Sequence, residues 1–489
     1  MDDILDGLSP APLWAHFGEI SAIPRCSGNE ERIRAYVLET AKGCGLESRM
    51  DTAGNLVVYA GASPGHEKAP SVVLQGHLDM VCEKEKDSPH DFARDPIRLK
   101  KQGDWITADG TTLGADNGIG VAAALAVLTD TKVVHGPLEC LFTVDEETGL
   151  AGASGLAPDM LSGQVLINLD TEEDGALYIG CAGGCDTQLI LDLETETPST
   201  PDGRTVRLHL GGLQGGHSGI DIHRQRGNAI RLLVRFLWTQ QAAGAAFRLV
   251  AINGGTKHNA IPRDCEALVW VPEEGLEPLT AEAARYAAVL SDEHAVSDPN
   301  VRLDVVDTGT TVPEAVFSTA FQERALNILY GLPNGVISMS QVVPDLVETS
   351  TNLAVVKTGA DRLRILTSQR SSVPSALEDV CGTVCAVARQ AGARVRRGEP
   401  YPAWKPNPDS ALLKTAETVY RSLFGGEPRV KAVHAGLECG IIGARFSGMD
   451  MISFGPTIQG AHCPSERVQV STVGRFWRLL TALIEALAS

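Results

Sequence analysis

The sequence has no cluster of basic residues, no long apolar run and no cysteine pair with metal-binding spacing. It contains 42 lysines and arginines against 61 acidic residues, which gives a formal net charge of -19. A chain this acidic is expected to bind neither nucleic acid nor an anionic membrane surface. Its first twenty residues are acidic and interrupted by prolines, unlike a signal peptide, and runs such as VAAALAVL are too short to cross a bilayer. These absences predict a cytoplasmic protein.

The eleven cysteines are scattered, and their two close pairs, CAGGC and CGTVC, lack the CxxC spacing of a zinc or redox site. We therefore expect most of them to be small buried residues in a reducing compartment. The composition, 43% hydrophobic and 21% charged, is that of a globular protein. A chain of 489 residues exceeds one ordinary hydrophobic core, so two domains of unequal size are expected.

Helical and strand patterns alternate up to about residue 185, which is typical of an α/β domain. Ser27 and Glu30 have the spacing of a capping box and predict a helix start there. A helix is predicted over 117–130, and apolar strands are predicted at 55–61, 71–81, 137–147, 164–173 and 176–181. After the proline-rich GEPYPAWKPNPDS, a helix over 411–424 and a strand over 449–455 resume the pattern.

The middle of the chain has a different order of elements. Strand, helix, strand, strand, helix and strand are predicted at 206–212, 228–238, 247–254, 265–271, 281–295 and 301–307. This is the order of a split βαβ sandwich, and a similar series over 314–398 indicates an internal duplication. We therefore predict an α/β catalytic domain formed by 1–185 and 399–489, with an inserted, duplicated α+β lid domain at 186–398.

The stretch SVVLQGHLDMV ends an apolar strand with His77 and Asp79, two residues apart. Side chains alternate along a strand, so both project from the same face. A carboxylate in this position can orient the imidazole of a metal-ligating histidine. A strand that runs out into solvent would also end in polar residues, so further ligands are needed to decide between the two interpretations.

Four other features place acids or histidine where strands end or a helix begins. Asp116 precedes a helix in a glycine-rich loop, where an aspartate is also a common cap. The acids at 145–147 follow a strand and would repel one another without a cation, unless the loop is simply solvated. Asp170 and His462 also follow apolar strands. Since α/β sheets bind ligands at the carboxyl ends of their strands, the set predicts a metal site.

The predicted ligands offer oxygen and imidazole but no thiolate. This suits zinc, manganese or cobalt in a catalytic site and not a structural zinc finger. Two histidines and at least three carboxylates are more than one open catalytic zinc needs. Two ions about 3.5–4 Å apart that share a carboxylate would use them all and activate a water molecule at neutral pH.

The ordered motifs of the chain resemble those of bacterial aminoacyl-histidine (Xaa-His) dipeptidases. These motifs are GHLDMV, TLGADNGIGVAAALA, FTVDEETGLAGA, LINLDTEEDG, GGHSGIDI, NAIPR, HAGLECG and AHCPSERV. Such enzymes belong to the cocatalytic-zinc metallopeptidases, as do carnosinases, aminoacylases and deacetylases. The resemblance covers almost the whole chain and implies a zinc-peptidase-like catalytic domain with a mixed sheet.

The resemblance also implies roles for individual residues. The site would bind two zinc ions, or manganese or cobalt. One ion would be bound by His77 and Asp170, the other by Glu147 and His462, and Asp116 would bridge the two ions. Asp79 would orient His77, and Glu146 would be the general base.

In the lid, the resemblance gives His217 of GGHSG the task of stabilising the developing oxyanion. Without the resemblance, a histidine among glycines would be interpreted as a turn residue. Asn259, Arg263 and Arg370 would bind the terminal carboxylate of the substrate, and the sequence leaves open which arginine does so. The pocket would also contain, just ahead of a helix, His434 and Glu438 of HAGLECG, for which a capped helix start is the alternative.

The predicted reaction is hydrolysis of short peptides with a free C-terminal carboxylate, chiefly Xaa-His dipeptides such as β-alanyl-histidine. The alternative is an N-acyl amino acid hydrolase, because the same chemistry cleaves either amide, although deacylases of this superfamily usually have a single lid unit. A non-catalytic binding protein is disfavoured by Glu146, which a metal site does not need as a ligand. A duplicated lid would let a monomer act alone, although relatives also form homodimers.

Overall fold

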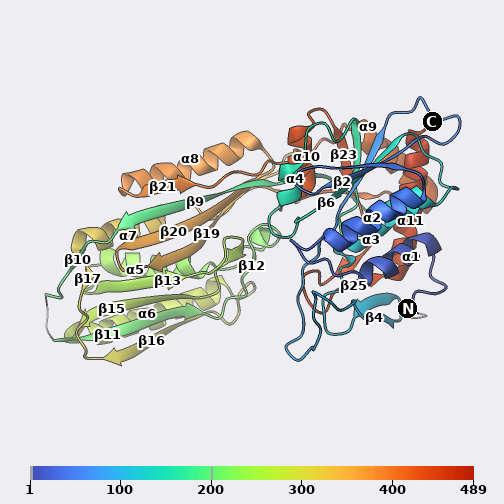
Figure 1. The fold of residues 1–489 in the computed structure, drawn as a ribbon. Helices are drawn as coiled ribbons and strands as arrows, with labels where there is room; N and C mark the ends of the chain where they lie inside the picture. Colours follow the sequence, from blue (N-terminus) through green and yellow to red (C-terminus); the bar gives the residue numbers. More distant parts are fainter. Residues whose placement is uncertain (1–3, 200–201) are drawn as a thin grey trace. The chain divides into compact units, whose positions relative to one another are not determined.

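The computed structural model describes residues 4–199 and 202–489 and divides into two compact units (Figure 1). Unit 1 consists of the described residues up to Cys181 with Trp404–Ala432 and Leu437–Ser489. Unit 2 consists of Ala182–Ala403 and a short return at Val433–Gly436. The chain therefore leaves unit 1 after Cys181 and comes back to it at Trp404. The sequence did not indicate that the short segment Val433–Gly436 belongs to unit 2.

In the described residues, unit 1 is built on an eight-stranded mixed sheet, which confirms the predicted fold class. Its strands, in spatial order, are β1 (Glu47–Met50), β2 (Leu56–Ala60), β6 (Leu138–Thr143), β3 (Val72–His77), β7 (Val165–Asn168), β23 (Asp450–Ser453), β8 (Ala176–Cys181) and β22 (Arg429–Val433). The central strands β6, β3, β7 and β23 run parallel, whereas β2 and β8 pair antiparallel at their flanks. The carboxyl ends of the four parallel strands therefore lie along one edge.

Helices cover this sheet and form the core of unit 1 with it. They are α1 (Ala11–Ser21), α2 (Glu31–Gly43), α3 (Ala115–Thr129), α4 (Ala151–Gly155), α9 (Ala411–Phe424), α10 (Glu438–Arg445) and α11 (Val470–Leu487). Helix α3 is apolar on all sides because it packs between β3 and α1, and nearly all of it is buried. No helix among the described residues has the length and apolarity that crossing a membrane requires.

A smaller sheet links the C-terminal loop region to an early part of the chain. Strands β24 (Ile458–Gln459) and β25 (Arg467–Gln469) pair antiparallel as a hairpin. Strand β25 also pairs with β5 (Trp105–Ala108), which pairs with β4 (Leu99–Gln102). The hairpin loop that contains His462 is therefore anchored from both of its strands.

Unit 2 contains, in the described residues, a nine-stranded sheet that joins two sets of four strands. The first set, in spatial order, is β16 (Arg302–Gly309), β11 (Gly203–Gly211), β15 (Cys265–Pro272) and β13 (Arg248–Gly254), with α5 (Ala229–Ala242) and α6 (Glu273–Glu293). The second is β21 (Arg394–Arg397), β9 (Gly183–Asp192), β20 (Arg362–Ser371) and β19 (Val347–Thr358), with α7 (Thr319–Gly331) and α8 (Pro374–Gln390). Strands β13 and β19 join the sets, and β18 (Gly335–Met339) pairs with β19.

Each set places its first strand between its fourth and its third, as in a split βαβ sandwich, so the order of elements is duplicated. The two sets are not consecutive, because β9 belongs to the second set but precedes the first in the chain. The predicted boundary at residue 185 lies inside β9. The sequence pattern did not reveal this strand because its partner strands are far away in the chain.

The predicted capping box at Ser27 and Glu30 is wrong. Helix α2 begins at Glu31 without a side-chain cap. The Ser27 hydroxyl instead donates to Asp79 Oδ2 at 2.7 Å, and Glu30 Oε1 accepts from the backbone N–H groups of Gly28 and Asp145. These two side chains therefore connect the segment before α2 to the loops that follow β3 and β6.

A disulfide between Cys26 and Cys82 joins the same two regions, and the scatter of the cysteines did not predict it. The disulfide connects the segment before α2 to the loop after β3. Of the other cysteines in the described residues, seven are buried and only Cys44 and Cys463 are exposed. Most of the cysteines are thus buried, as expected.

Candidate metal centre

The structure brings the five predicted metal ligands together in unit 1. His77 ends β3, Glu147 and Asp170 follow β6 and β7, Asp116 lies in the first turn of α3, and His462 lies in the β24–β25 loop. They form two groups in which the ligand atoms all lie within 4.8 Å of one another, namely His77, Asp116 and Asp170, and Asp116, Glu147 and His462. Asp116 belongs to both groups.

The two carboxylate oxygens of Asp116 face different histidines. His77 Nε2 lies 3.1 Å from Asp116 Oδ1 and 3.2 Å from Asp170 Oδ1. His462 Nε2 lies 3.2 Å from Asp116 Oδ2 and 2.9 Å from Glu147 Oε2. Asp116 caps no backbone N–H of α3, so the interpretation of this residue as a helix cap is wrong.

These residues fit divalent cations. Glu147 Oε1 is buried and has no hydrogen-bond partner among the described residues. A buried carboxylate oxygen without a donor is costly, and a bound cation removes that cost. The donor atoms are oxygen and imidazole nitrogen, which zinc, manganese and cobalt accept.

The charges of the cluster are strongly coupled. Burial, reinforced by Asp116 and Glu147, raises the pKa of Asp170 to about 7, although His77 opposes this change. Hydrogen bonds to Asp116 and Glu147 raise the pKa of His462 to about 11. Without a cation the cluster therefore retains protons near neutral pH, and cations that bind to deprotonated imidazole must displace them.

Asp79 contacts residues of the cluster without belonging to either ligand group. It is fully buried, and its Oδ1 lies 3.4 Å from His77 Nδ1. Its two oxygens also accept hydrogen bonds from the backbone N–H groups of Glu146 and Glu147, at 3.0 and 3.1 Å. His77 Nδ1 also lies 3.1 Å from the backbone oxygen of Asp79. Asp79 thus contacts one metal-ligand candidate and holds the backbone of the next.

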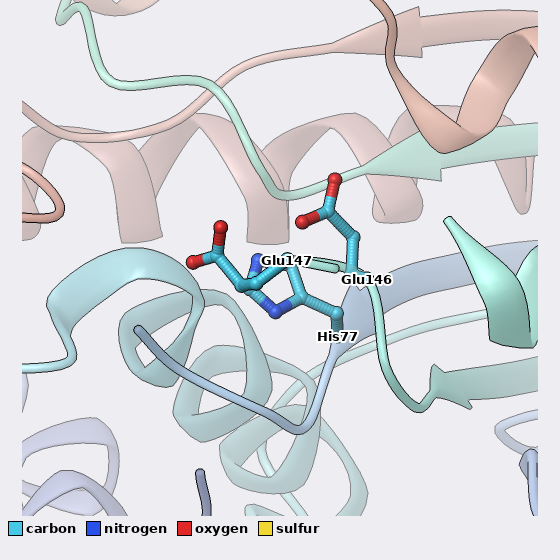
Figure 2. A group of neighbouring side chains, drawn as sticks. All are labelled: His77, Glu146 and Glu147. Carbon is cyan, nitrogen blue, oxygen red and sulfur yellow. The ribbon is translucent and has the colours of Figure 1, made fainter. Parts of the chain in front are cut away.

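Glu146 and Glu147 are neighbours in sequence, but their carboxylates point to different sides (Figure 2). Glu147 reaches His462, whereas Glu146 has an oxygen within 4.8 Å of ligand atoms of His77 and Glu147. Burial raises the pKa of Glu146 well above its usual value, although His77 opposes the change. A carboxylate with a raised pKa beside a cluster of candidate metal ligands suits proton transfer.

Two buried charged residues that the sequence analysis missed hold the Asp116 loop. Glu466 accepts hydrogen bonds from four consecutive backbone N–H groups, of Leu113, Gly114, Ala115 and Asp116, at 2.7, 2.9, 2.7 and 3.3 Å. Arg25 donates to the carbonyl oxygens of Leu78, Asp79 and Gly114. Gly114 has a φ of 71°, and a Cβ there would lie 2.6 Å from Arg25 Nη2, so the loop requires glycine.

Glu438, a predicted substrate-binding residue, also lies in unit 1. It is fully buried at the start of α10, and its Oε2 accepts hydrogen bonds from Gln75 and Thr143. Burial raises the pKa of Glu438 to about 7, with His77 opposing this change. The alternative interpretation, a capped helix start, does not hold, because no side-chain hydrogen bond caps α10.

The other predicted substrate-binding residues and His217 belong to unit 2. Arg370 is almost fully buried and donates to the Tyr401 hydroxyl at 2.7 Å. His434 Nε2 lies 2.7 Å from the Ser350 hydroxyl, and burial, with Arg370 and His217, lowers the pKa of His434 to about 3. Arg370, His217 and His434 thus lie close enough for the charge of Arg370 to add to burial in keeping both imidazoles neutral near pH 7. On the segment that joins β13 to β15, Asn259 is half-buried and Arg263 is exposed.

Comparisons with known proteins agree with this site. The profile of peptidase family M20/M25/M40 matches residues 73–486. The cytosol non-specific dipeptidase of Escherichia coli K12 is 42% identical over 482 residues, which cover 98% of each chain. The crystal structure of aminoacylhistidine dipeptidase from Vibrio alginolyticus has a TM-score of 0.89 and 41% identity, covering 99% of this chain and 98% of that one.

The fold alone is shared with aminopeptidase PepT from Bacillus cereus, at a TM-score of 0.61 and 16% identity over 99% of this chain and 100% of that one. The close matches confirm the resemblance found in the sequence motifs. This chain belongs to peptidase family M20/M25/M40.

Proposed function

We propose that this protein is a metal-dependent dipeptidase of the cytoplasm. Its substrates are short peptides with a free C-terminal carboxylate, chiefly Xaa-His dipeptides such as β-alanyl-histidine. The observation that carries the proposal is the pair of ligand groups that share Asp116. The names of two relatives, a cytosol non-specific dipeptidase and an aminoacylhistidine dipeptidase, support the substrate class.

Two divalent cations, zinc or alternatively manganese or cobalt, occupy the centre in this proposal. The residues that would hold them are His77, Asp116, Glu147, Asp170 and His462. When bound, the cations supply Lewis-acid activation of water and of the peptide carbonyl. The buried Oε1 of Glu147, which has no hydrogen-bond partner among the described residues, supports this assignment.

Glu146 acts as the general base. It takes a proton from the attacking water and passes it to the leaving amine, which then departs as a neutral group. Asp79 keeps His77 and the backbone of residues 146–147 in position. The raised pKa of Glu146 supports this role, because a base with a pKa closer to neutrality can both accept and return a proton.

His217 donates a hydrogen bond to the carbonyl oxygen of the substrate as negative charge develops on it. Its Nδ1 accepts hydrogen bonds from the backbone N–H groups of Gly219 and Ile220, at 3.2 and 3.0 Å, so its proton is on Nε2. Burial and Arg370 lower the pKa of His217 to about 4, so the imidazole is neutral at pH 7. A neutral imidazole with a fixed Nε2–H is a suitable oxyanion donor.

His217→Ala should lower turnover by roughly 10²–10³-fold, the loss typical of a missing oxyanion donor, without changing metal content. Turnover of the best dipeptide and metal content by plasma emission spectroscopy are the two measurements. His209→Ala is the matched control, because His209 lies in the same unit and pairs only with surface carboxylates in the described residues. Equal turnover in His217→Ala and wild type would contradict the assigned role.

Arg370 binds the terminal carboxylate of the substrate. Its guanidinium is buried beside His217 and His434, and its Nε has no hydrogen-bond partner among the described residues. A guanidinium with a free N–H and little solvent contact suits a carboxylate. Arg263 is exposed and is less suited to this contact. Asn259 and His434 remain predicted residues of the substrate pocket. Replacing the proposed carboxylate-binding residue, in Arg370→Ala, should raise KM for dipeptides.

Turnover of a substrate panel tests the proposed function. The protein, loaded separately with zinc, manganese and cobalt, is given alanyl-histidine, β-alanyl-histidine, alanyl-alanine, a tripeptide and N-acetyl-histidine. We expect hydrolysis of the dipeptides and little hydrolysis of N-acetyl-histidine. Faster hydrolysis of N-acetyl-histidine would identify a deacylase, and metal binding without any turnover would identify a binding protein. Light scattering in the same buffers distinguishes a monomer from a homodimer.

A further inference from the structure

The Glu438 carboxylate is buried beside the candidate metal centre and is not among its ligands. Strand β3 places Gln75 on the same face as His77, and Gln75 donates to Glu438 Oε2 at 2.6 Å. The hydroxyl of Thr143, three residues before Glu146, donates to the same oxygen at 2.7 Å. The metal-ligand groups found among the described residues do not contain Glu438.

A chain of buried polar side chains fixes the orientation of this carboxylate. Gln75 Oε1 accepts from Asn168 Nδ2 at 2.5 Å, and Asn168 Oδ1 accepts from the Ser453 hydroxyl at 2.5 Å. These residues lie on the neighbouring strands β3, β7 and β23, close to the carboxyl edge of the sheet. This network fixes the side chain of Gln75, which together with Thr143 holds Glu438 Oε2 in one place.

The other oxygen, Glu438 Oε1, is buried and has no hydrogen-bond partner among the described residues. Leaving a buried carboxylate oxygen without a donor destabilises the folded protein, and the more so when the group is charged. A donor that arrives with the substrate would remove this cost. Since Glu438 lies among other acids, a cationic donor fits better than a neutral one.

A dipeptide carries such a donor next to its scissile bond. Its α-ammonium group is attached to the carbon adjacent to the carbonyl carbon, so it must lie beside the metal centre when the carbonyl does. There the cations repel it, and a carboxylate is needed to compensate. An N-acyl amino acid has no ammonium group and would leave Glu438 Oε1 unpaired.

Building on the proposed function, we infer that Glu438 binds the free amino group of the substrate and thereby selects dipeptides over N-acyl amino acids. The ammonium group donates to Oε1 while Gln75 and Thr143 hold Oε2. Glu438 is thus a specificity-determining residue on the amino side of the scissile bond. The carboxylate end of the substrate is recognised by other groups.

Three substrates with a common leaving group test the inference. Alanyl-histidine and β-alanyl-histidine carry the amino group on different carbons, and propionyl-histidine is the analogue of both that lacks it. In Glu438→Gln, kcat/KM for the two dipeptides should fall about 10²-fold, while kcat/KM for propionyl-histidine should stay within about threefold of wild type. Metal content is measured in every protein.

Glu139→Gln is the matched control, because Glu139 is also a buried glutamate, on β6, but its oxygens accept hydrogen bonds from Ser71 and Ser162. It should keep the wild-type ratio between amino and des-amino substrates. Equal losses on all three substrates in Glu438→Gln would show a structural role and overturn the inference, as would an unchanged ratio. A wild-type protein that cleaves no dipeptide would instead refute the proposed function itself.

Glu438→Asp provides a second test that does not depend on how well Glu438→Gln folds. The shorter side chain withdraws the carboxylate by one methylene group, and the longer amino arm of β-alanyl-histidine can follow it. The variant should therefore shift the ratio of kcat/KM values towards β-alanyl-histidine and away from alanyl-histidine. A ratio equal to that of wild type would overturn the inference.

Discussion

Glu146→Gln is expected to lower turnover by roughly 10²–10⁴-fold while metal content and substrate affinity stay at wild-type values. Glutamine keeps the size and hydrogen bonding of the side chain but cannot take the proton of the attacking water. The carboxylates of Glu146 and Glu147 are directed to different sides, so replacing Glu146 leaves the predicted ligand Glu147 in place (Figure 2). Single-turnover kinetics, substrate titration and plasma emission spectroscopy measure the three quantities.

Glu147→Gln is the matched comparison for Glu146→Gln, because the two residues are adjacent and chemically identical. Glu147 lies 2.9 Å from His462 and has a buried oxygen without a partner among the described residues, so its replacement should lose metal as well as rate. If Glu146→Gln loses metal while Glu147→Gln retains it, the two roles are exchanged. Full activity in Glu146→Gln would rule out the general-base role.

Asp116→Ala should remove metal more completely than any other single replacement in the cluster. The two oxygens of Asp116 face His77 and His462 separately, so its loss affects both ligand groups and leaves two dications without a shared anion between them. We expect activity to be abolished at micromolar metal. Metal content after dialysis is the measurement, and Asp130→Ala, at the other end of α3, is the control. Two full equivalents of metal in Asp116→Ala would exclude a bridging role.

The sequence predicted those parts of the fold in which local pattern decides the structure. The apolar run 71–77 and the helix that follows Asp116 are recognisable because burial imposes a period of two on a half-buried strand or makes a central element apolar throughout. Strand β9 was missed because it completes a set whose other strands come much later in the chain. Which strands become neighbours depends on contacts that no local window contains.

The candidate site could be predicted from the sequence where ligands stand at strand ends, as His77 and Asp170 do. The residues that hold those ligands could not. Glu466 accepts hydrogen bonds from four consecutive backbone N–H groups. A sequence does not show which distant carboxylate will accept from the N–H groups of a given loop. Ser27 was predicted to cap a helix because its hydroxyl has the right spacing, but in the folded protein Asp79 is the stronger acceptor nearby.

The position of β23 in the sheet affects when unit 1 can finish folding during synthesis. This strand lies between β7 and β8, yet Ser453 is 285 residues after its hydrogen-bond partner Asn168. During synthesis, all of Ala182–Ala403 leaves the ribosome before β23 does. Until then β7 has no strand paired on the side that β23 will occupy. His462 and Glu466 emerge later still. A nascent chain therefore lacks one residue of the candidate metal centre, His462, and one residue that holds the Asp116 loop, Glu466, until translation is almost finished.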